Sequence, residues 1–195
     1  MPEAGHGLAP KEPAPLRPAE AEDTEPRPTT ALERIVPENS DFAVRRADHV
    51  GFSVASLDSA LRFWVEGLGG QLVRVGDMDG EFLGEVTGAH GASVRMAIVS
   101  LAGQMIELLE YRGVDLQHRA SRPFDPGFAH LALIVDDIDS LLERIAVYEW
   151  IPQGKPQVIS GGTRAGTKVI YAVGPDGATI ELMQLPKATK NHNAD

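Results

Sequence analysis

The chain has no cysteine among its 195 residues, which excludes disulfide bonds, thiolate metal ligands and cysteine nucleophiles. It also lacks any apolar run that approaches the roughly 20 residues of a membrane-spanning helix. No continuous apolar segment follows the initial methionine, so no signal peptide is predicted and the cytoplasm is the expected location. Basic residues are few, because 18 Lys and Arg stand against 28 Asp and Glu. The resulting net charge of −10 argues against nucleic-acid binding, which needs a basic face.

Residues 1–43 are poor in apolar side chains and rich in proline, glutamate and alanine. Such a segment buries too little apolar surface to offset the entropy that it loses on ordering. It is therefore predicted to be a disordered tail, and a second tail is predicted over residues 187–195. The remainder, about 150 residues, is long enough for one domain or two small fused modules with a core.

A pattern of strand, helix and three strands occurs twice in this remainder. The first copy is predicted as a strand over 49–54, a helix over 56–70 and strands over 71–76, 92–101 and 104–111. The second copy is predicted as a strand over 128–135, a helix over 136–150 and strands over 157–160, 167–173 and 178–185. The copies define modules over 44–113 and 128–186, which are joined by a linker over 114–127. The predicted fold is α+β, with two tandem βαβββ modules that form mixed sheets.

The repeat places one histidine and one glutamate at matched positions of each copy. His49 and His130 belong to the first strands, and Glu107 and Glu181 belong to the last strands. Because strand side chains alternate, all four face away from the apolar residues that meet the helices. A carboxylate flanked by apolar residues in a strand is costly unless it is paired or binds a metal. Taken singly, each of the four is more typical of a structural or solvated residue. Their duplicated placement predicts one converging site for a divalent ion: zinc, nickel, cobalt, iron or manganese.

Four stretches, DHVGFSV, GQMIELLEY, FAHLALIVDDID and GPDGATIELMQLP, resemble the vicinal oxygen chelate superfamily. This superfamily includes glyoxalase I, methylmalonyl-CoA epimerase, extradiol dioxygenases, fosfomycin-resistance enzymes and bleomycin-resistance proteins. The resemblance covers about residues 46–186 and implies sheets that curl around a metal, which a small substrate chelates through adjacent oxygens. It also implies a homodimer, and it leaves open whether the modules pair within one chain or across the dimer.

The four predicted ligands match the ligand set of glyoxalase I. This match implies a metal-dependent lyase or isomerase that transfers a proton through a metal-stabilised enediolate or enolate. Glu181 is the first candidate for the base, and Glu107 is the second. Arg95, Tyr111 and Ser53 are expected to bind the substrate.

Three alternatives remain open at this point. A methylmalonyl-CoA-epimerase-like enzyme has Gln where this chain has Glu107, and it has a catalytic acid near residues 93–97, which here read Ser-Val-Arg-Met-Ala. An extradiol-type dioxygenase binds iron through two His and one Glu, so a fourth ligand counts against it. A bleomycin-resistance-like dimer sequesters its ligand and lacks the metal ligands. Ser53 and Tyr111 stand where glyoxalase I has Arg and Asn for glutathione, so the sequence does not identify the substrate.

Overall fold

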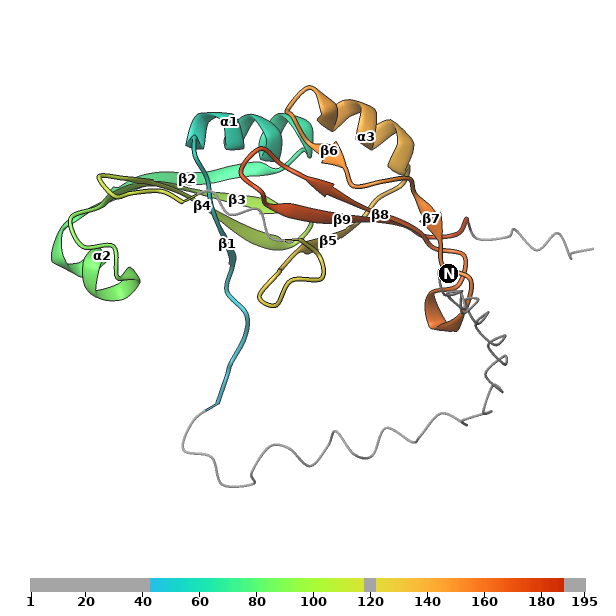
Figure 1. The fold of residues 1–195 in the computed structure, drawn as a ribbon, viewed down its shortest axis with the longest axis horizontal. Helices are drawn as coiled ribbons and strands as arrows, with labels where there is room; N and C mark the ends of the chain where they lie inside the picture. Colours follow the sequence, from blue (N-terminus) through green and yellow to red (C-terminus); the bar gives the residue numbers. More distant parts are fainter. Residues whose placement is uncertain (1–42, 118–121, 188–195) are drawn as a thin grey trace, which may run out of the picture. The chain divides into compact units, whose positions relative to one another are not determined.

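The computed structural model describes residues 43–117 and 122–187, and the two predicted tails lie outside this part apart from residues 43 and 187. Two β-sheets form, one from each half of the repeat (Figure 1). The predicted α+β fold with mixed sheets is therefore confirmed. In the described part of the chain, no helix is long and apolar enough to cross a membrane.

The first sheet has the strand order β1-β4-β3-β2, in which β1 runs parallel to β4 and the other neighbours are antiparallel. Its strands are β1 (Val50–Ser53), β2 (Gln71–Met78), β3 (Ser93–Leu101) and β4 (Gln104–Arg112). The predicted helix between β1 and β2 forms as α1 (Leu57–Leu61), which continues as η2 (Arg62–Gly67). The η2 segment has the wider π-helical winding, so the helix changes its hydrogen-bond spacing halfway along.

The second sheet has the order β5-β9-β8-β6, with β7 also paired to β8. Its strands are β5 (Leu131–Ile134), β6 (Ile151–Pro152), β7 (Gln157–Val158), β8 (Lys168–Val173) and β9 (Thr179–Gln184). Between them lie α3 (Ile138–Ala146) and η3 (Gly162–Arg164), a single 3₁₀ turn. The helix and the first strand are both shorter than predicted, and β6 was not predicted at all. The repeat is thus clearest in the parallel pairs β1–β4 and β5–β9.

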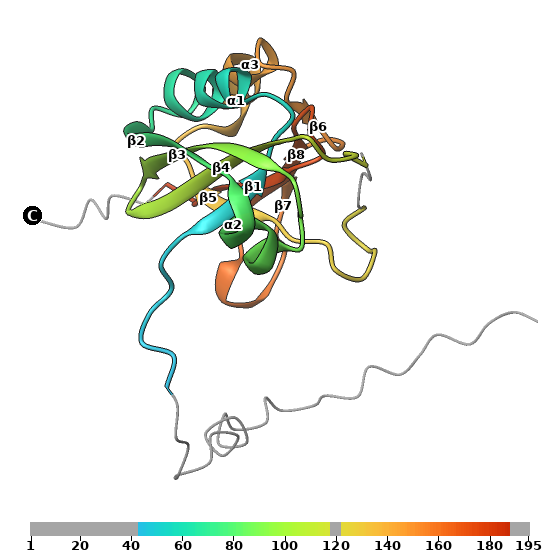
Figure 2. The same cartoon turned by 90° about the vertical axis from the view of Figure 1, so that its left-hand side faces the viewer.

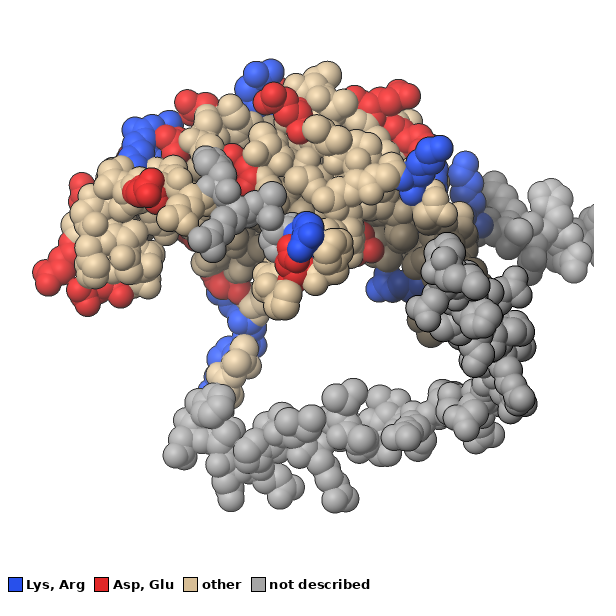
Figure 3. Space-filling view, viewed as in Figure 1, with Lys and Arg blue, Asp and Glu red and all other residues tan. Residues whose placement is uncertain are grey.

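A helix that the sequence pattern did not predict, α2 (Gly80–Thr87), follows β2. Two glycines lie within this short segment, which weakens its helix propensity, so tertiary packing has to support it. Leu83 supplies that packing, because it is 2% exposed in a cluster with Val94 and Met96 of β3. Figure 2 shows α2 on the side of the first sheet that faces away from α1. Acidic side chains gather on the surface at this end of the molecule (Figure 3).

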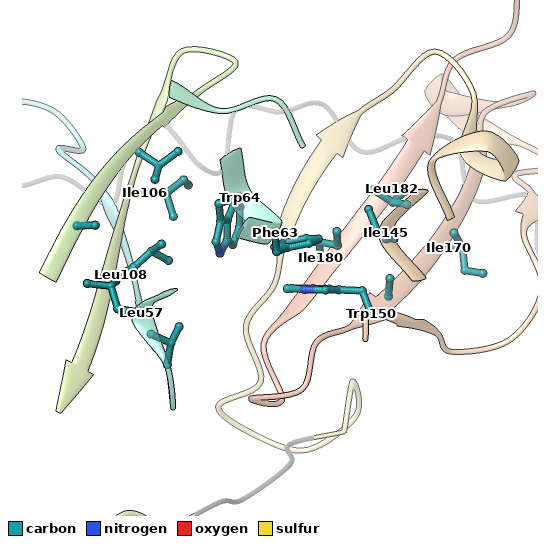
Figure 4. Packing of buried hydrophobic residues seen from close by; sticks show 14 of the residues in the cluster. Leu57, Phe63, Trp64, Ile106, Leu108, Ile145, Trp150, Ile170, Ile180 and Leu182 are labelled. Atoms are coloured by element: carbon teal, nitrogen blue, oxygen red, sulfur yellow. The ribbon is translucent and has the colours of Figure 1, made fainter. Parts of the chain in front are cut away.

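The main core lies between the sheets and the helical segments α1, η2 and α3. Aromatic side chains join the two halves there: the Phe63 ring stacks on the Trp150 ring at a centroid distance of 4.0 Å. Trp64 meets both rings edge-on (Figure 4). Aliphatic residues from both sheets complete this core: Leu57, Ile106, Leu108, Ile138, Ile145, Ile180 and Leu182. Each residue on this list is less than 2% exposed, so one continuous core stabilises both halves.

A hydrogen bond also connects the halves at the surface. The Ala55 amide, just before α1, donates to Oδ1 of Asp176 at 3.1 Å. Asp176 belongs to the turn between β8 and β9. The start of the first helix is therefore tied to the hairpin of the second sheet.

The helices α1 and α3 begin in the same way. The first amide of each helix donates a hydrogen bond to a side chain on the last strand of its own half. The Leu57 amide donates to Glu110 on β4, and the Ile138 amide donates to Gln184 on β9, each at 2.9 Å. An acidic residue in each first turn then pairs with a cation on the neighbouring strand. These pairs are Asp58 with Arg95 at 3.1 Å and Asp139 with Lys168 at 2.6 Å. The duplication therefore includes the means by which each helix is held to its sheet.

Candidate metal-binding site

The first sheet presents one of the two predicted His–Glu pairs. His49 lies directly before β1, and Glu107 lies in the middle of β4, where its register partner on β1 is Gly51. Phe52 packs against Trp64 on the helix side, so strand alternation turns Gly51 and Glu107 to the opposite face. Nε2 of His49 lies 3.2 Å from Oε2 of Glu107. We call this pair the first half-site.

The second sheet repeats the arrangement with matching geometry. His130 lies directly before β5, and Glu181 lies in β9 opposite Ala132. Nε2 of His130 lies 3.2 Å from Oε2 of Glu181. Both neighbours of Glu181 along the strand, Ile180 and Leu182, are fully buried on the helix side. We call this pair the second half-site.

The donor atoms of each half-site fit a divalent ion. Two ligands at right angles, each about 2.1 Å from a metal, lie about 3 Å apart, which is close to the observed separations. Imidazole and carboxylate donors suit zinc, nickel, cobalt, iron and manganese. Within residues 43–117 and 122–187, no three His, Asp or Glu side chains cluster in a way that could hold a metal. In a single chain, the four predicted ligands therefore form two pairs on two sheets.

The two histidines have different neighbours. Nδ1 of His49 lies 3.2 Å from a carboxylate oxygen of Asp48, which also pairs with Arg46 at 2.6 Å. The hydrogen bond with His49, followed by the charge of Arg46, holds the pKa of Asp48 below its ordinary value. A carboxylate on one ring nitrogen fixes the tautomer that leaves the other nitrogen free for a metal. The ring of His130 instead forms a cluster with two aromatic rings, those of Phe128 and Tyr171.

Tyr171 is a neighbour of the second half-site that the sequence pattern did not single out. It lies on β8 directly opposite Glu181, and its ring centroid is 4.9 Å from that of His130. Burial, followed by the charge of Glu181, raises the pKa of the Tyr171 hydroxyl. The sequence held a signal for this position, since residues that pair in a hairpin can be counted outward from its turn. Counted outward from the three-residue loop Pro-Asp-Gly, across which the Gly174 amide donates to the Ala178 carbonyl, Tyr171 falls opposite Glu181.

Two of the predicted substrate-binding residues lie on the same face as the first half-site. Ser53 is two residues beyond Gly51 on β1, and Tyr111 is four residues beyond Glu107 on β4. Both line a pocket of about 180 Å³ together with residues of the following loop. The structure thus brings these two side chains together in one pocket, whose lining includes neither His49 nor Glu107.

Arg95, the third predicted substrate-binding residue, lies on the other face of the first sheet. Its register partner is Glu110, whose side chain faces α1, so Arg95 is on the helix side of the sheet. There its guanidinium contacts Asp58 at 3.1 Å and Glu110 at 3.4 Å. The hydrogen bond to Asp58 raises the pKa of Arg95. The structure therefore places Arg95 in the attachment of the first helix, on the opposite face from Glu107.

Residues 46–182 match the family model of the glyoxalase/bleomycin resistance protein/dioxygenase superfamily. The chain is 32% identical over 143 residues to a 2-epi-5-epi-valiolone epimerase from an Actinomyces species, covering 71% of this chain and 78% of the relative. It is 33% identical over 138 residues to a probable lactoylglutathione lyase from Synechocystis, covering 70% of this chain and 92% of the relative. It spans only 44% of the length of a lactoylglutathione lyase from Arabidopsis thaliana.

A solved structure also has a fold similar to that of this chain. The glyoxalase family protein from Bacillus cereus is 25% identical and superposes with a TM-score of 0.64. The match covers 76% of this chain and 99% of that protein. Both halves of the repeat therefore have counterparts in a fold known from experiment.

Proposed function

Because the chain belongs to the glyoxalase/bleomycin resistance protein/dioxygenase superfamily, we propose that it is a divalent-metal-dependent lyase or isomerase of the glyoxalase type. The observation that carries this proposal is the duplicated His–Glu pair, with the same 3.2 Å separation on both sheets. The relatives named as a lyase and as an epimerase support this reaction class. The substrate is a small molecule with two adjacent oxygens.

We propose further that two copies of the chain complete the site. His49 and Glu107 of one copy face His130 and Glu181 of a second copy, so that four side chains hold one ion. A two-fold pairing repeats this contact and produces two equal sites in a closed dimer. The arrangement is supported by the location of the two half-sites on separate sheets of one chain.

The bound ion would act as a Lewis acid that polarises the two substrate oxygens. Glu181 takes the proton from the carbon beside these oxygens and returns it to the product. Glu107 is the second candidate for this role. The buried neighbours of Glu181 exclude water from the strand on one side and hold the carboxylate in place. Ser53 and Tyr111 line one pocket, lie on strands of the first half-site, and are the proposed contacts to the rest of the substrate.

The test combines metal analysis with proton-exchange NMR. The purified protein is loaded with nickel, cobalt, zinc, manganese or iron, and α-hydroxy ketones, hemithioacetals and acyl thioesters are screened in deuterated water. Stoichiometric metal and exchange at the carbon next to the carbonyl, without oxygen consumption, are the expected results. Iron with oxygen uptake would favour a dioxygenase. Full metal content in a His49→Ala, His130→Ala double variant would refute the site.

An epimerase is the second candidate function, and the Actinomyces relative favours it. Epimerisation uses the same proton abstraction, but the proton returns to the opposite face of the same carbon. The exchange experiment separates the two reactions because an epimerase yields the inverted stereoisomer. A lyase instead yields a product with a broken bond, and an isomerase that is not an epimerase yields one with a moved carbonyl group.

A further inference from the structure

The two half-sites are equivalent in their His–Glu pair but differ in the residue opposite the glutamate. On the first sheet, the register partner of Glu107 on β3 is Ile98. On the second sheet, the register partner of Glu181 on β8 is Tyr171. One half-site therefore has an aliphatic side chain at the position where the other has a phenol.

At a second matched position, the residue on the second sheet is again the one that carries a hydroxyl group. Two residues before each glutamate, on the same face, the first sheet has Met105 and the second has Thr179. Thr179 is 2% exposed, and its hydroxyl has no hydrogen-bond partner within the described part of the chain. The second half-site therefore carries hydroxyl groups where the first is apolar.

The position of Tyr171 is well defined by its neighbours. Facing side chains of paired strands have their Cβ atoms about 5 Å apart, so a phenol extends past the carboxylate opposite it. The ring also packs against His130 at 4.9 Å and lies 6.2 Å from Phe128, which limits its rotation. Its hydroxyl is held on the same sheet face as the proposed ligands.

We propose that Tyr171 is a substrate-binding residue that donates a hydrogen bond to the substrate oxygen at the second half-site. This inference rests on the proposed function and refines its substrate. The oxygen that becomes negatively charged lies toward Tyr171, and the apolar end of the molecule lies toward Ile98 and Met105. A fixed donor aimed at a developing oxyanion stabilises the transition state more than the ground state. The difference between the half-sites would thereby select one orientation of the substrate.

The test uses the full-length, metal-loaded protein and the Tyr171→Phe variant, which removes only the hydroxyl. The matched control is Tyr148→Phe, because Tyr148 packs against Phe63 on the helix side. Three quantities are measured: metal affinity by competition with a chelator, binding of acetohydroxamate by calorimetry, and the rate of proton exchange. Acetohydroxamate is an anionic chelator with two adjacent oxygens, so it probes the proposed contact without turnover.

For Tyr171→Phe, metal affinity is expected to stay within about twofold, because a residue beside the ligands is not itself a ligand. Acetohydroxamate binding should weaken about ten- to hundredfold, as expected when a hydrogen bond to a charged group is lost. The kcat of exchange should fall about a hundredfold, with a smaller change in KM. Tyr148→Phe should leave all three quantities unchanged.

Equal acetohydroxamate affinity in wild type and Tyr171→Phe would overturn the inference while leaving the proposed function intact. A loss of metal affinity in Tyr171→Phe that matches the loss in chelator binding would also overturn it, because the residue would then act only on the ligands. A wild-type protein that binds neither metal nor acetohydroxamate would refute the proposed function and this inference together.

Discussion

Nε2 of His130 lies 3.2 Å from Oε2 of Glu181, although the two residues are 51 positions apart in the sequence. The parallel pairing of β5 with β9 creates this contact. The same pairing in the first half brings His49 to Glu107. Each half of the chain therefore supplies one imidazole nitrogen and one carboxylate oxygen as proposed metal ligands.

Replacing Glu181 with Gln should nearly abolish catalysis, because an amide cannot accept the substrate proton. We expect proton exchange to fall by at least about a hundredfold, in the range usual for loss of a general base. Metal affinity should fall by about tenfold or more, since a neutral oxygen is a poorer ligand for these cations. The measurements are exchange by NMR and metal content after dialysis. Glu143→Gln, on an exposed position of α3, is the control and should behave as wild type.

Two inactive variants should restore activity to each other if two copies share each site. His49→Ala and His130→Ala are purified separately, mixed, partly unfolded and refolded together. A mixed dimer then has one site that lacks both histidines and one that is intact, so random pairing should recover about a quarter of wild-type activity. Recovery is measured against each variant refolded alone. If the mixture stays inactive while dimers exchange subunits, the shared site is refuted.

Glu110 should contribute a pH-dependent stability. The hydrogen bond from the Leu57 amide, followed by Arg112 and Arg95, holds its pKa below the ordinary value. Its stabilising effect is full above the pKa of an unfolded glutamate, about 4.3, and is lost as the pH falls through the lower folded pKa. Glu110→Gln should therefore reduce the free energy of unfolding at pH 7 by about 1–3 kcal/mol.

The measurement is denaturant unfolding at several pH values. The difference between wild type and Glu110→Gln should shrink below pH of about 4, where the wild-type carboxylate also becomes protonated. Glu85→Gln, on the exposed side of α2, is the control and should have no such effect. A difference that is constant from pH 7 to pH 3 would contradict the role assigned to the Glu110 charge.

Gly174→Ala should destabilise the contact between the two halves. A Cβ at this position would lie 2.7 Å from two atoms of the Trp150 ring, which is itself stacked on Phe63. Overpacking of this kind typically costs about 1–3 kcal/mol. Gly161→Ala is the matched control, because a Cβ there would meet nothing within 4 Å. Thermal unfolding should show a lower Tm for Gly174→Ala alone.

Much of the fold follows from local patterns in the sequence. Alternating apolar residues and a repeated His and Glu were sufficient to predict two βαβββ modules with mixed sheets and the faces of all four proposed ligands. The parallel pairing of the first and last strand of each module is a finding of the structure. Predicting the sheet faces of Arg95 and Tyr171 needs one more step, because these faces depend on hairpin register. That step is to count residue pairs outward from each hairpin turn. Counted outward from the turn at Ala102 and Gly103, Arg95 falls opposite Glu110.

Other features depend on contacts that no local pattern encodes. The α2 helix is weak by propensity and forms where Leu83 meets the sheet. The joining of the halves depends on Phe63 and Trp150, which are 87 positions apart in the sequence. The relation between the two half-sites also depends on a second copy of the chain, as proposed above, and one sequence does not describe that contact.

The hydrogen bond from the Ala55 amide to Asp176 has a mechanical consequence. Asp176 sits in the turn that joins the strand of Tyr171 to the strand of Glu181, and Ala55 follows the strand that begins beside His49. Neither segment can shift outward alone without breaking this bond. A pull on one half-site is therefore also transmitted through this amide to the hairpin that bears the other, in addition to the aromatic core that the halves share.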